Sequence, residues 1–274
     1  MLFCYLDASR QNLMRPQQLI TILLAGSVVL LSVQCTQSPS ESTLPAKHIA
    51  DAARMAAIIE PTVSASVDSN LTLRLWAVDS LVADPVSIDI DDVGQLYYTR
   101  TNRQKHAEFD IRGHQDWEIE SIRLQSIEEK REFLHRALAP EKSGKNQWLS
   151  DLNGDGSHDW KDMTVERENI YQLRDTDGDG LADESRLLVS DFHEEVTDAA
   201  GGILRHGNDL FVGIGPDLWR YQFDDQFVRQ KTSISHGYGI HIGFSGHGMS
   251  GIEVGPEGKI YWQIGDIGFS GKDQ

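Results

Sequence analysis

Two residues near the end of the sequence have the types and spacing needed to move a proton. His247 and Asp266 lie in a stretch, Gly246 to Gly268, where apolar and polar residues alternate on either side of the turn sequence GPEG. This alternation predicts a β-hairpin that brings both residues to one edge of a sheet. An imidazole beside a carboxylate can act as a general base held by its partner. The alternative is a loop histidine that only caps a strand.

The same stretch resembles the soluble quinoprotein glucose and sorbosone dehydrogenases, which are six-bladed β-propellers. The residues that match their pattern are His247, Ser250, Gly251, Gly255, Pro256, Lys259, Ile260, Tyr261, Gly265 and Asp266. The resemblance implies that His247 takes the hydroxyl proton of a sugar or alcohol substrate, that Asp266 pairs with it, and that pyrroloquinoline quinone (PQQ) takes the hydride. Ile252 stands where the sugar dehydrogenases usually have arginine.

The hairpin pattern of apolar alternation, turn and aliphatic-aromatic pair occurs three times. The pairs are Leu96-Tyr97, Leu210-Phe211 and Ile260-Tyr261, and the last two are about 50 residues apart, close to the length of a propeller blade. With 24 Gly and 6 Trp in 274 residues, the sequence predicts an all-β fold. Three repeats cannot close a ring. We therefore expect an incomplete β-propeller of N-terminal blades over residues 71–274.

A small insertion is expected between the first two repeats, at about residues 103–168. Ser126 and Glu129 form a capping box that predicts the start of a helix, and Pro140 ends it. Upstream, the sequence RGHQDW contains His114 and Trp117. These two side chains either line a site or belong to a half-buried surface loop, which is the commoner environment for isolated residues of these types.

Two acidic loops have the spacing of calcium sites, in which oxygen ligands alternate along the chain and glycine permits a sharp turn. The expected ligands are Asp151, Asn153, Asp155, Asp159 and Asp162 in the first loop, and Asp175, Asp177, Asp179 and Asp183 in the second. Position twelve is Asp162 in one loop and Arg186 in the other, so neither has the usual glutamate. The alternative is an Asp/Gly-rich turn that binds nothing.

The N-terminal segment, residues 1–35, has the features of an export signal. An apolar run from Gln18 to Val33 follows Arg15, and Cys35 precedes the polar tract TQSPSES. We expect lipidation at Cys35 and hence a membrane anchor, the alternatives being a plain cleaved signal or an uncleaved anchor. Residues 36–70 are expected to be a linker with a helix over Ala46 to Ile59. The formal net charge of −17 argues against a nucleic-acid partner.

A broader resemblance extends over Leu71 to Gly268, to the N-terminal part of large bacterial membrane-bound dehydrogenase-like proteins. It implies a c-type cytochrome or another electron acceptor as partner, with any haem c located beyond residue 274. The sequence thus predicts part of an exported, periplasmic or cell-surface quinoprotein-like dehydrogenase for a sugar or alcohol.

Three alternatives remain open at the level of the sequence. The first is a non-catalytic, calcium-stabilised propeller that binds or scaffolds at the cell surface. The second is a calcium-dependent adhesion protein. The third concerns one segment only: His236, His241 and His247 lie on a Gly-rich stretch and could gather a transition metal, although glycine there more often lets the backbone approach a neighbour closely.

Overall fold

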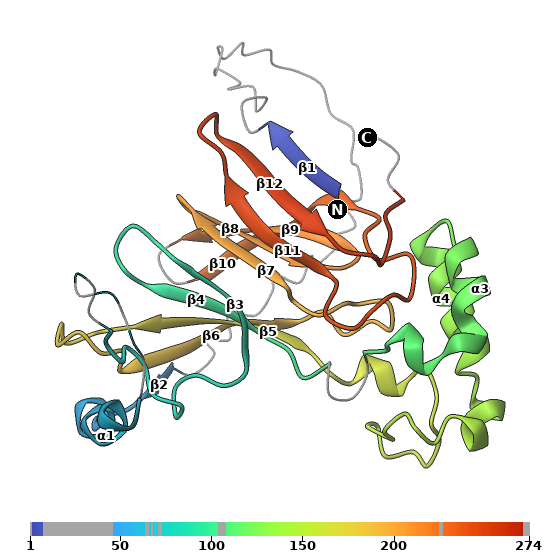
Figure 1. Ribbon diagram of the computed structural model, residues 1–274, viewed down its shortest axis with the longest axis horizontal. Coiled ribbons are helices and arrows are strands. Elements are labelled where there is room, and N and C mark those ends of the chain that lie inside the picture. Colours follow the sequence, from blue (N-terminus) through green and yellow to red (C-terminus); the bar gives the residue numbers. More distant parts are fainter. Residues whose placement is uncertain are drawn as a thin grey trace, which may run out of the picture.

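The computed structural model describes residues 2–7, 46–63, 66, 68, 70, 73–103, 108–224 and 227–270. They form three antiparallel sheets and a group of short helices at one end of the sheets (Figure 1). Cys35, the expected lipidation site, lies outside the described residues. Among the helices of the described part, none has the length and apolar character needed to cross a membrane.

The first sheet has the strand order β2-β6-β5-β4-β3. Strands β3 (Pro85–Ile90) and β4 (Leu96–Arg100) form the expected hairpin, and Asp91 in its turn accepts hydrogen bonds from the N–H groups of Val93 and Gln95. Strands β5 (Glu168–Arg174) and β6 (Glu184–Asp191) continue the sheet on either side of the second acidic loop, as the sequence predicts.

The helix expected over Ala46 to Ile59 is wrong in its first half. Strand β2 (Ala46–His48) pairs with the edge of β6, and helix α1 spans only Ala52–Ile59, followed by the 3-10 turn η2 (Glu60–Thr62). Ala and Lys favour helices in isolation, but the hydrogen bonds offered by the edge of β6 override that preference. Because Ala56 of α1 is buried against the outer part of the first sheet, this part of the expected linker packs on the sheet.

The second sheet is a four-stranded meander made of β7 (Gly202–His206), β8 (Asp209–Ile214), β9 (Asp217–Asp224) and β10 (Phe227–His236). The third sheet contains the expected hairpin of β11 (Met249–Val254) and β12 (Lys259–Ile264), with β1 (Leu2–Asp7) on its outer edge. The GPEG turn closes by a hydrogen bond from the N–H of Gly255 to the carbonyl of Lys259. All three aliphatic-aromatic pairs fall on the second strand of a hairpin, namely β4, β8 and β12.

Strand β7 lies between β3 and β11, so the first strands of the three hairpins are neighbours. Apolar side chains fill both interfaces: one cluster lies between the first and second sheets and another between the second and third. Ile252 belongs to the second interface. It is only 4% exposed, and a Cβ atom placed on Gly202 would lie 2.9 Å from its side chain. The all-β prediction is confirmed, and the three sheets do not close into a ring.

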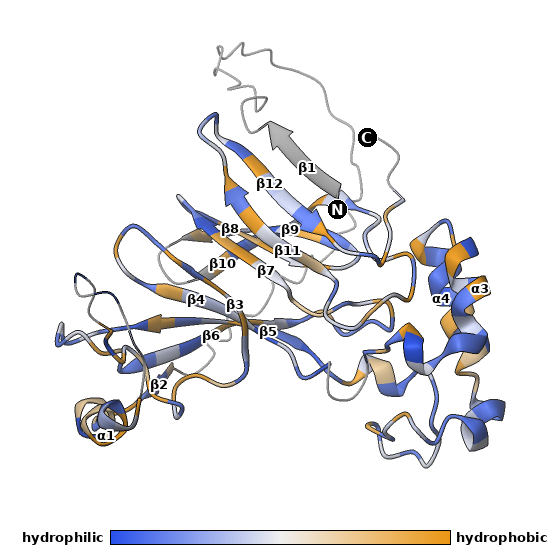
Figure 2. Cartoon of the chain, viewed as in Figure 1, coloured by the Kyte–Doolittle hydropathy of each residue, from blue (hydrophilic) through white to orange (hydrophobic). Residues whose placement is uncertain are grey.

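The segment between β4 and β5 forms the predicted helical insertion. Helix α4 (Ile127–Ala137) begins at the expected capping box, in which the Ser126 hydroxyl accepts a hydrogen bond from the N–H of Glu129. The sequence analysis did not anticipate helix α3 (Glu118–Arg123). Hydrophobic and hydrophilic residues alternate around both helices (Figure 2), and the buried side of α4 packs into an apolar cluster of its own. The remaining turns are η3 (Ile111–Gly113), η4 (Gln115–Trp117), η5 (Pro140–Lys145) and η6 (Asp162–Thr164).

Candidate functional site

The structure brings His247 and Asp266 together as the hairpin predicts. His247 precedes β11 and Asp266 follows β12, and the distance from Nδ1 of the imidazole to Oδ1 of the carboxylate is 2.8 Å. The other carboxylate oxygen accepts a hydrogen bond from the N–H of Phe244 at 3.2 Å. The His247 side chain is 52% exposed and that of Asp266 is 39% exposed. With Nδ1 occupied by Asp266, Nε2 is the ring nitrogen that can accept a proton from a bound molecule.

Close backbone packing holds the pair in place. The N–H of Gly265 donates to the carbonyl of His247 at 3.1 Å, and a Cβ atom on Gly265 would lie 2.5 Å from that oxygen. Only glycine leaves room for this approach. On the other side, the edge of the Phe244 ring contacts the imidazole, with 5.4 Å between ring centroids. The pair therefore has a fixed position at the sheet end that the insertion also faces.

A small polar cavity lies beside the pair, between the insertion and the loops that enter β7 and β11. Its volume is about 50 Å³, enough for a few water molecules. Oδ2 of Asp198 is buried and has no hydrogen-bond partner within the described part of the chain. A Cβ atom on Gly248 would lie 2.5 Å from that oxygen, so Asp198 sits directly under the residue that follows His247. Burial raises the pKa of Asp198, and the nearby Lys130 ammonium opposes this effect.

Lys130 and Glu108 face the same cavity from the insertion. The Lys130 ammonium donates to the carbonyl of Gly239 at 2.7 Å, and burial lowers its pKa. Glu108 accepts hydrogen bonds from the N–H of Gly246 at 2.7 Å and from the Ser245 hydroxyl at 3.0 Å. Burial nevertheless raises the pKa of Glu108. These contacts attach the insertion to the loop that carries His247.

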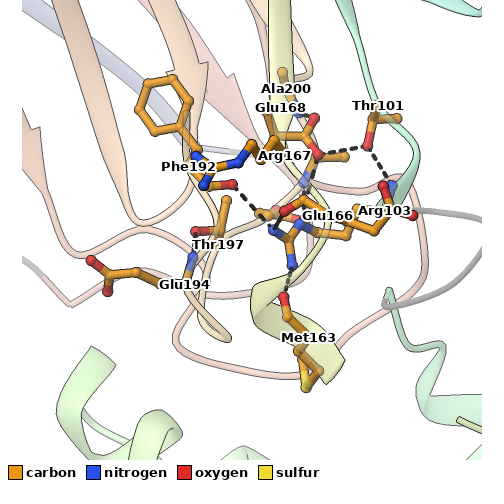
Figure 3. Close-up of polar contacts among 12 residues, drawn as sticks. Thr101, Arg103, Met163, Glu166, Arg167, Glu168, Phe192, Glu194, Thr197 and Ala200 are labelled. Carbon is orange, nitrogen blue, oxygen red and sulfur yellow. Dashed lines mark hydrogen bonds and ion pairs between the residues drawn. The ribbon is translucent and has the colours of Figure 1, made fainter. Parts of the chain in front are cut away.

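A buried ion pair fixes the base of the insertion (Figure 3). The Arg103 guanidinium donates to the carbonyls of Met163, Glu166 and Phe192 and lies 3.6 Å from Oε1 of Glu168. Glu168 also accepts hydrogen bonds from the Thr101 hydroxyl at 2.8 Å and from the N–H of Ala200 at 2.9 Å. Burial raises the pKa of Glu168 to about 7 despite these donors. The pair ties together both ends of the insertion and the loop that holds Asp198.

The two acidic loops share one backbone geometry. In the first loop, Asp151 accepts hydrogen bonds from the N–H groups of Gly154 and Gly156; in the second, Asp175 accepts them from Gly178 and Gly180. All four glycines have positive φ, between 71° and 91°. The two loops therefore share one backbone geometry around their first aspartate.

The loops differ in which carboxylates come together. In the second loop, oxygens of Asp175, Asp177 and Asp179 lie within 4.8 Å of one another, the only such acidic group found among the described residues. Asp183 instead accepts hydrogen bonds from the N–H and hydroxyl of Thr176. In the first loop, Asp162 is buried and accepts from three backbone N–H groups, and Asp159 is buried with one unpartnered oxygen, Oδ2. The remaining expected ligands, Asn153 and Asp155, accept backbone hydrogen bonds within the first loop.

The three histidines of the Gly-rich stretch do not gather around one point. Each imidazole Nδ1 has a different partner: Asp217 for His236 at 2.9 Å, the carbonyl of Ser121 for His241 at 2.7 Å, and Asp266 for His247. A shared transition-metal site is therefore not formed by these side chains. His114 and Trp117 do come together, because their rings stack with 4.2 Å between centroids.

Asp198, Lys130 and Glu108 were not among the functional residues expected from the sequence. One signal could have identified Asp198: it lies in the loop before the first strand of the second hairpin, as His247 lies before the first strand of the third. When the second and third repeats are aligned on their aliphatic-aromatic pairs, Asp198 and His247 fall in corresponding loops, each before the first strand of its hairpin. No local pattern marks Lys130 or Glu108, because only the packing of the insertion against the third sheet brings them to the cavity.

Residues 60–273 match a protein family described as a domain of unknown function, DUF7133. No curated protein and no solved structure matches the chain.

Proposed function

We propose a function for this chain, which belongs to the DUF7133 family: it is part of an exported oxidoreductase that oxidises a hydroxyl group of a sugar or alcohol. His247 is the general base, and Asp266 orients it. The observation that carries the proposal is the hydrogen bond of 2.8 Å between Nδ1 of His247 and Oδ1 of Asp266, at an exposed sheet end. The expected lipid anchor at Cys35 and a periplasmic or cell-surface location belong to the same proposal.

The roles of the two side chains follow from their geometry. The carboxylate accepts the Nδ1 proton, so the lone pair of the neutral ring lies on Nε2. A substrate hydroxyl within hydrogen-bond distance of Nε2 would lose its proton to this nitrogen, and Asp266 would stabilise the imidazolium that forms. The Phe244 ring packs against the imidazole at an angle of 77°, so the substrate must approach the part of the imidazole that is exposed.

The resemblance to quinoproteins implies PQQ as the hydride acceptor, and its three carboxylates require cationic side chains near the base. Among the described residues, the cations in the cavity beside the pair are already engaged, because Lys130 and Arg103 line it and donate to backbone carbonyls. Ile252, at the position of the family's arginine, is buried between two sheets. Arg112 lies over the Phe244 ring, but both its Nε and its NH2 donate to Asp110. The quinone is therefore the part of the proposal that rests on the resemblance alone.

We propose that the three sheets are consecutive blades of a β-propeller. Two observations support this arrangement: the first strands of the three hairpins are neighbours, and the second sheet is a complete four-stranded meander. A third concerns the free face of β3. Val86, Ile88 and Ile90 share this face and are 46% to 59% exposed. A row of exposed aliphatic side chains on a first strand is the surface that another blade would cover.

Calcium is proposed for both acidic loops. The clustered oxygens of Asp175, Asp177 and Asp179 support the second site, and the unpartnered buried oxygen of Asp159 supports the first. The second loop joins β5 to β6 at the sheet end opposite to His247. An ion there would stabilise the first sheet and would not contact the substrate.

A second candidate function is a non-catalytic, calcium-stabilised propeller that acts as a binding or scaffold module. The observation that favours it is the lack of available cationic side chains around His247 in the described part of the chain. In that case the role of the hairpin is structural, because Ile252 and its neighbours form the apolar interface between the second and third sheets.

The deciding experiment measures dye-linked dehydrogenase activity of the full-length protein with calcium and PQQ on a panel of sugars and alcohols. We expect quinone-dependent activity that falls by at least 10²-fold in His247→Ala, the usual minimum contribution of a general base. The melting temperature should change little, because the His247 side chain is exposed.

His236→Ala is a matched control. His236 pairs with Asp217 through the same atoms at nearly the same distance, 2.9 Å, and its side chain is 48% exposed. It should retain wild-type activity. Equal loss in both variants would show that a paired histidine matters only for the fold. A folded protein that neither binds the quinone nor acts on any substrate would refute the dehydrogenase proposal and favour the scaffold.

A further inference from the structure

The insertion contains an open cleft separate from the His247 pair. It lies between η4, the start of α3, the end of α4 and η5, and its volume is about 840 Å³. Clefts of this size are typical of binding sites for small organic molecules. Part of its lining is an aromatic wall, and Asp116, Glu120, Arg136, Lys142 and Lys145 form a charged edge, so different parts of a ligand would meet different chemistry.

Three rings form the aromatic wall: His114, Trp117 and Trp148. His114 stacks on Trp117, and Trp148 covers His114 with 4.3 Å between centroids. Phe109 contacts all three rings edge-on, and Phe133 contacts Trp117 in the same way. This backing fixes the wall before any ligand arrives. Trp148 nevertheless remains 46% exposed, which leaves part of a large flat ring at the surface.

The charged edge carries an excess of positive charge. Arg136 and Glu120 form an ion pair with each other. Lys142 donates one hydrogen bond to the carbonyl of Arg136, and Lys145 makes no hydrogen bond or ion pair with the described residues. Against these two lysines the cleft contains one further acid, Asp116. A cationic edge on a chain of net charge −17 indicates a ligand with a negative group.

The ligand must therefore combine a face that stacks on an indole, polar edges and an anionic group. A pyranose ring offers C–H bonds on its face, which carry the partial positive charge that the negative face of an indole attracts. Its hydroxyls hydrogen-bond to groups at the rim, and a uronate adds a carboxylate. We propose that this cleft binds acidic saccharides, with one sugar ring on the exposed face of Trp148 and its carboxylate facing Lys145.

The cleft adjoins the His247 pair through one short turn. In η3, the N–H of Ile111 donates to the carbonyl of Gly243, and the Arg112 guanidinium lies 5.0 Å from the centroid of the Phe244 ring. His114 of the aromatic wall follows two residues later. A saccharide chain held in the cleft is thereby kept at the same end of the molecule as the general base. The binding inference does not depend on the proposed oxidation, because it concerns affinity alone.

The test is isothermal titration calorimetry of the full chain with trigalacturonate and with galactotriose as the neutral counterpart. We expect the wild-type protein to bind trigalacturonate at least tenfold more tightly, and this preference to shrink as salt rises from 50 to 200 mM. Trp148→Ala should weaken binding of both saccharides at least tenfold, and Trp148→Phe should restore most of it. Lys145→Gln should reduce the preference for trigalacturonate at least threefold.

Lys161→Gln is the matched control, because Lys161 is an exposed lysine of the insertion that does not line the cleft. It should bind both saccharides as the wild type does. Each variant is first compared with the wild type by circular dichroism and melting temperature, and Lys145→Gln provides the binding comparison if Trp148→Ala is unfolded. Three results overturn the proposal: no binding of trigalacturonate at millimolar concentration, equal affinity for the neutral saccharide, or an unchanged preference for trigalacturonate in Lys145→Gln together with unchanged affinity in any folded Trp148→Ala.

Discussion

The buried carboxyl of Glu168 makes the stability of the protein depend on pH in a defined direction. Its pKa is about 7 in the folded protein, because burial outweighs the donors Ala200, Thr101 and Arg103, and is near 4.5 in the unfolded chain. Between these values the folded protein binds one proton that the unfolded chain has released. The contribution of this group is therefore fully present below pH 4.5 and is lost as the pH rises towards 7.

The magnitude follows from the difference between the two pKa values. At 1.36 kcal/mol per unit, a shift from 4.5 to about 7 corresponds to about 3 kcal/mol. The Glu168→Gln variant has no ionisable group at this position, so it does not lose this contribution to the free energy of unfolding as the pH rises. Relative to the wild type, the variant should be similar in stability at pH 4.5 and more stable by about 3 kcal/mol at pH 8. Urea unfolding at both pH values measures the difference.

Gln147→Ala is the control: Gln147 is exposed in the same insertion and its side chain does not ionise, so the variant should give the same difference from the wild type at both pH values. The opposite outcome for Glu168→Gln would refute the reasoning. If the variant loses stability at pH 8 relative to pH 4.5, the carboxylate is stabilised by Arg103 and its two hydrogen-bond donors more than it is destabilised by burial.

Two further predictions concern calcium and packing. Removal of calcium with a chelator should lower the melting temperature, since an ion at 100 times its Kd stabilises by about 2.7 kcal/mol per site. The Asp177→Asn, Asp179→Asn double variant should lose the part of this effect that comes from the second loop, and the turn variant Asp92→Asn should lose none. Unchanged melting under chelation would exclude structural calcium. Gly201→Ala places a Cβ atom 2.2 Å from the carbonyl oxygen of Met249 and should cost about 1–3 kcal/mol in urea unfolding, whereas Gly144→Ala, with no neighbour within 4 Å, should be neutral. Equal stability of the two alanine variants would contradict the packing of β7 against β11.

The sequence predicted the parts of the fold that local patterns specify. The hairpins β3–β4 and β11–β12 each combine an apolar alternation with a suitable turn, and the structure has both. The juxtaposition of His247 and Asp266 followed from the second hairpin, because only 19 positions separate them and both flank it. The start of α4 was predictable for the same reason, because the hydrogen bonds that cap it are local. The Ser126 hydroxyl accepts from the N–H of Glu129, and the Glu129 carboxylate accepts from the N–H of Gln125.

The parts that could not be predicted depend on contacts between distant segments. Ala46 to His48 are compatible with a helix, and only the free edge of β6 makes them a strand. The polar cavity joins Lys130 from α4 to Asp198 from the loop before β7. Alignment of the repeats could have pointed to Asp198, but only the packing of the insertion brings Lys130 beside it. The structural role of Ile252 was also hidden, because its neighbours Gly202 and Gly213 belong to another sheet.

The position of the insertion has a consequence for the order of folding. Thr101 and Glu168 are bonded across a separation of 67 positions, and closing a disordered loop of that length costs about 4 kcal/mol of chain entropy. The insertion has a largely local apolar cluster around α4, so it can collapse early and shorten the gap between β4 and β5. Pairing of these two strands should then follow the insertion in time. The rate at which the first sheet assembles is thereby governed by helices that are not part of it.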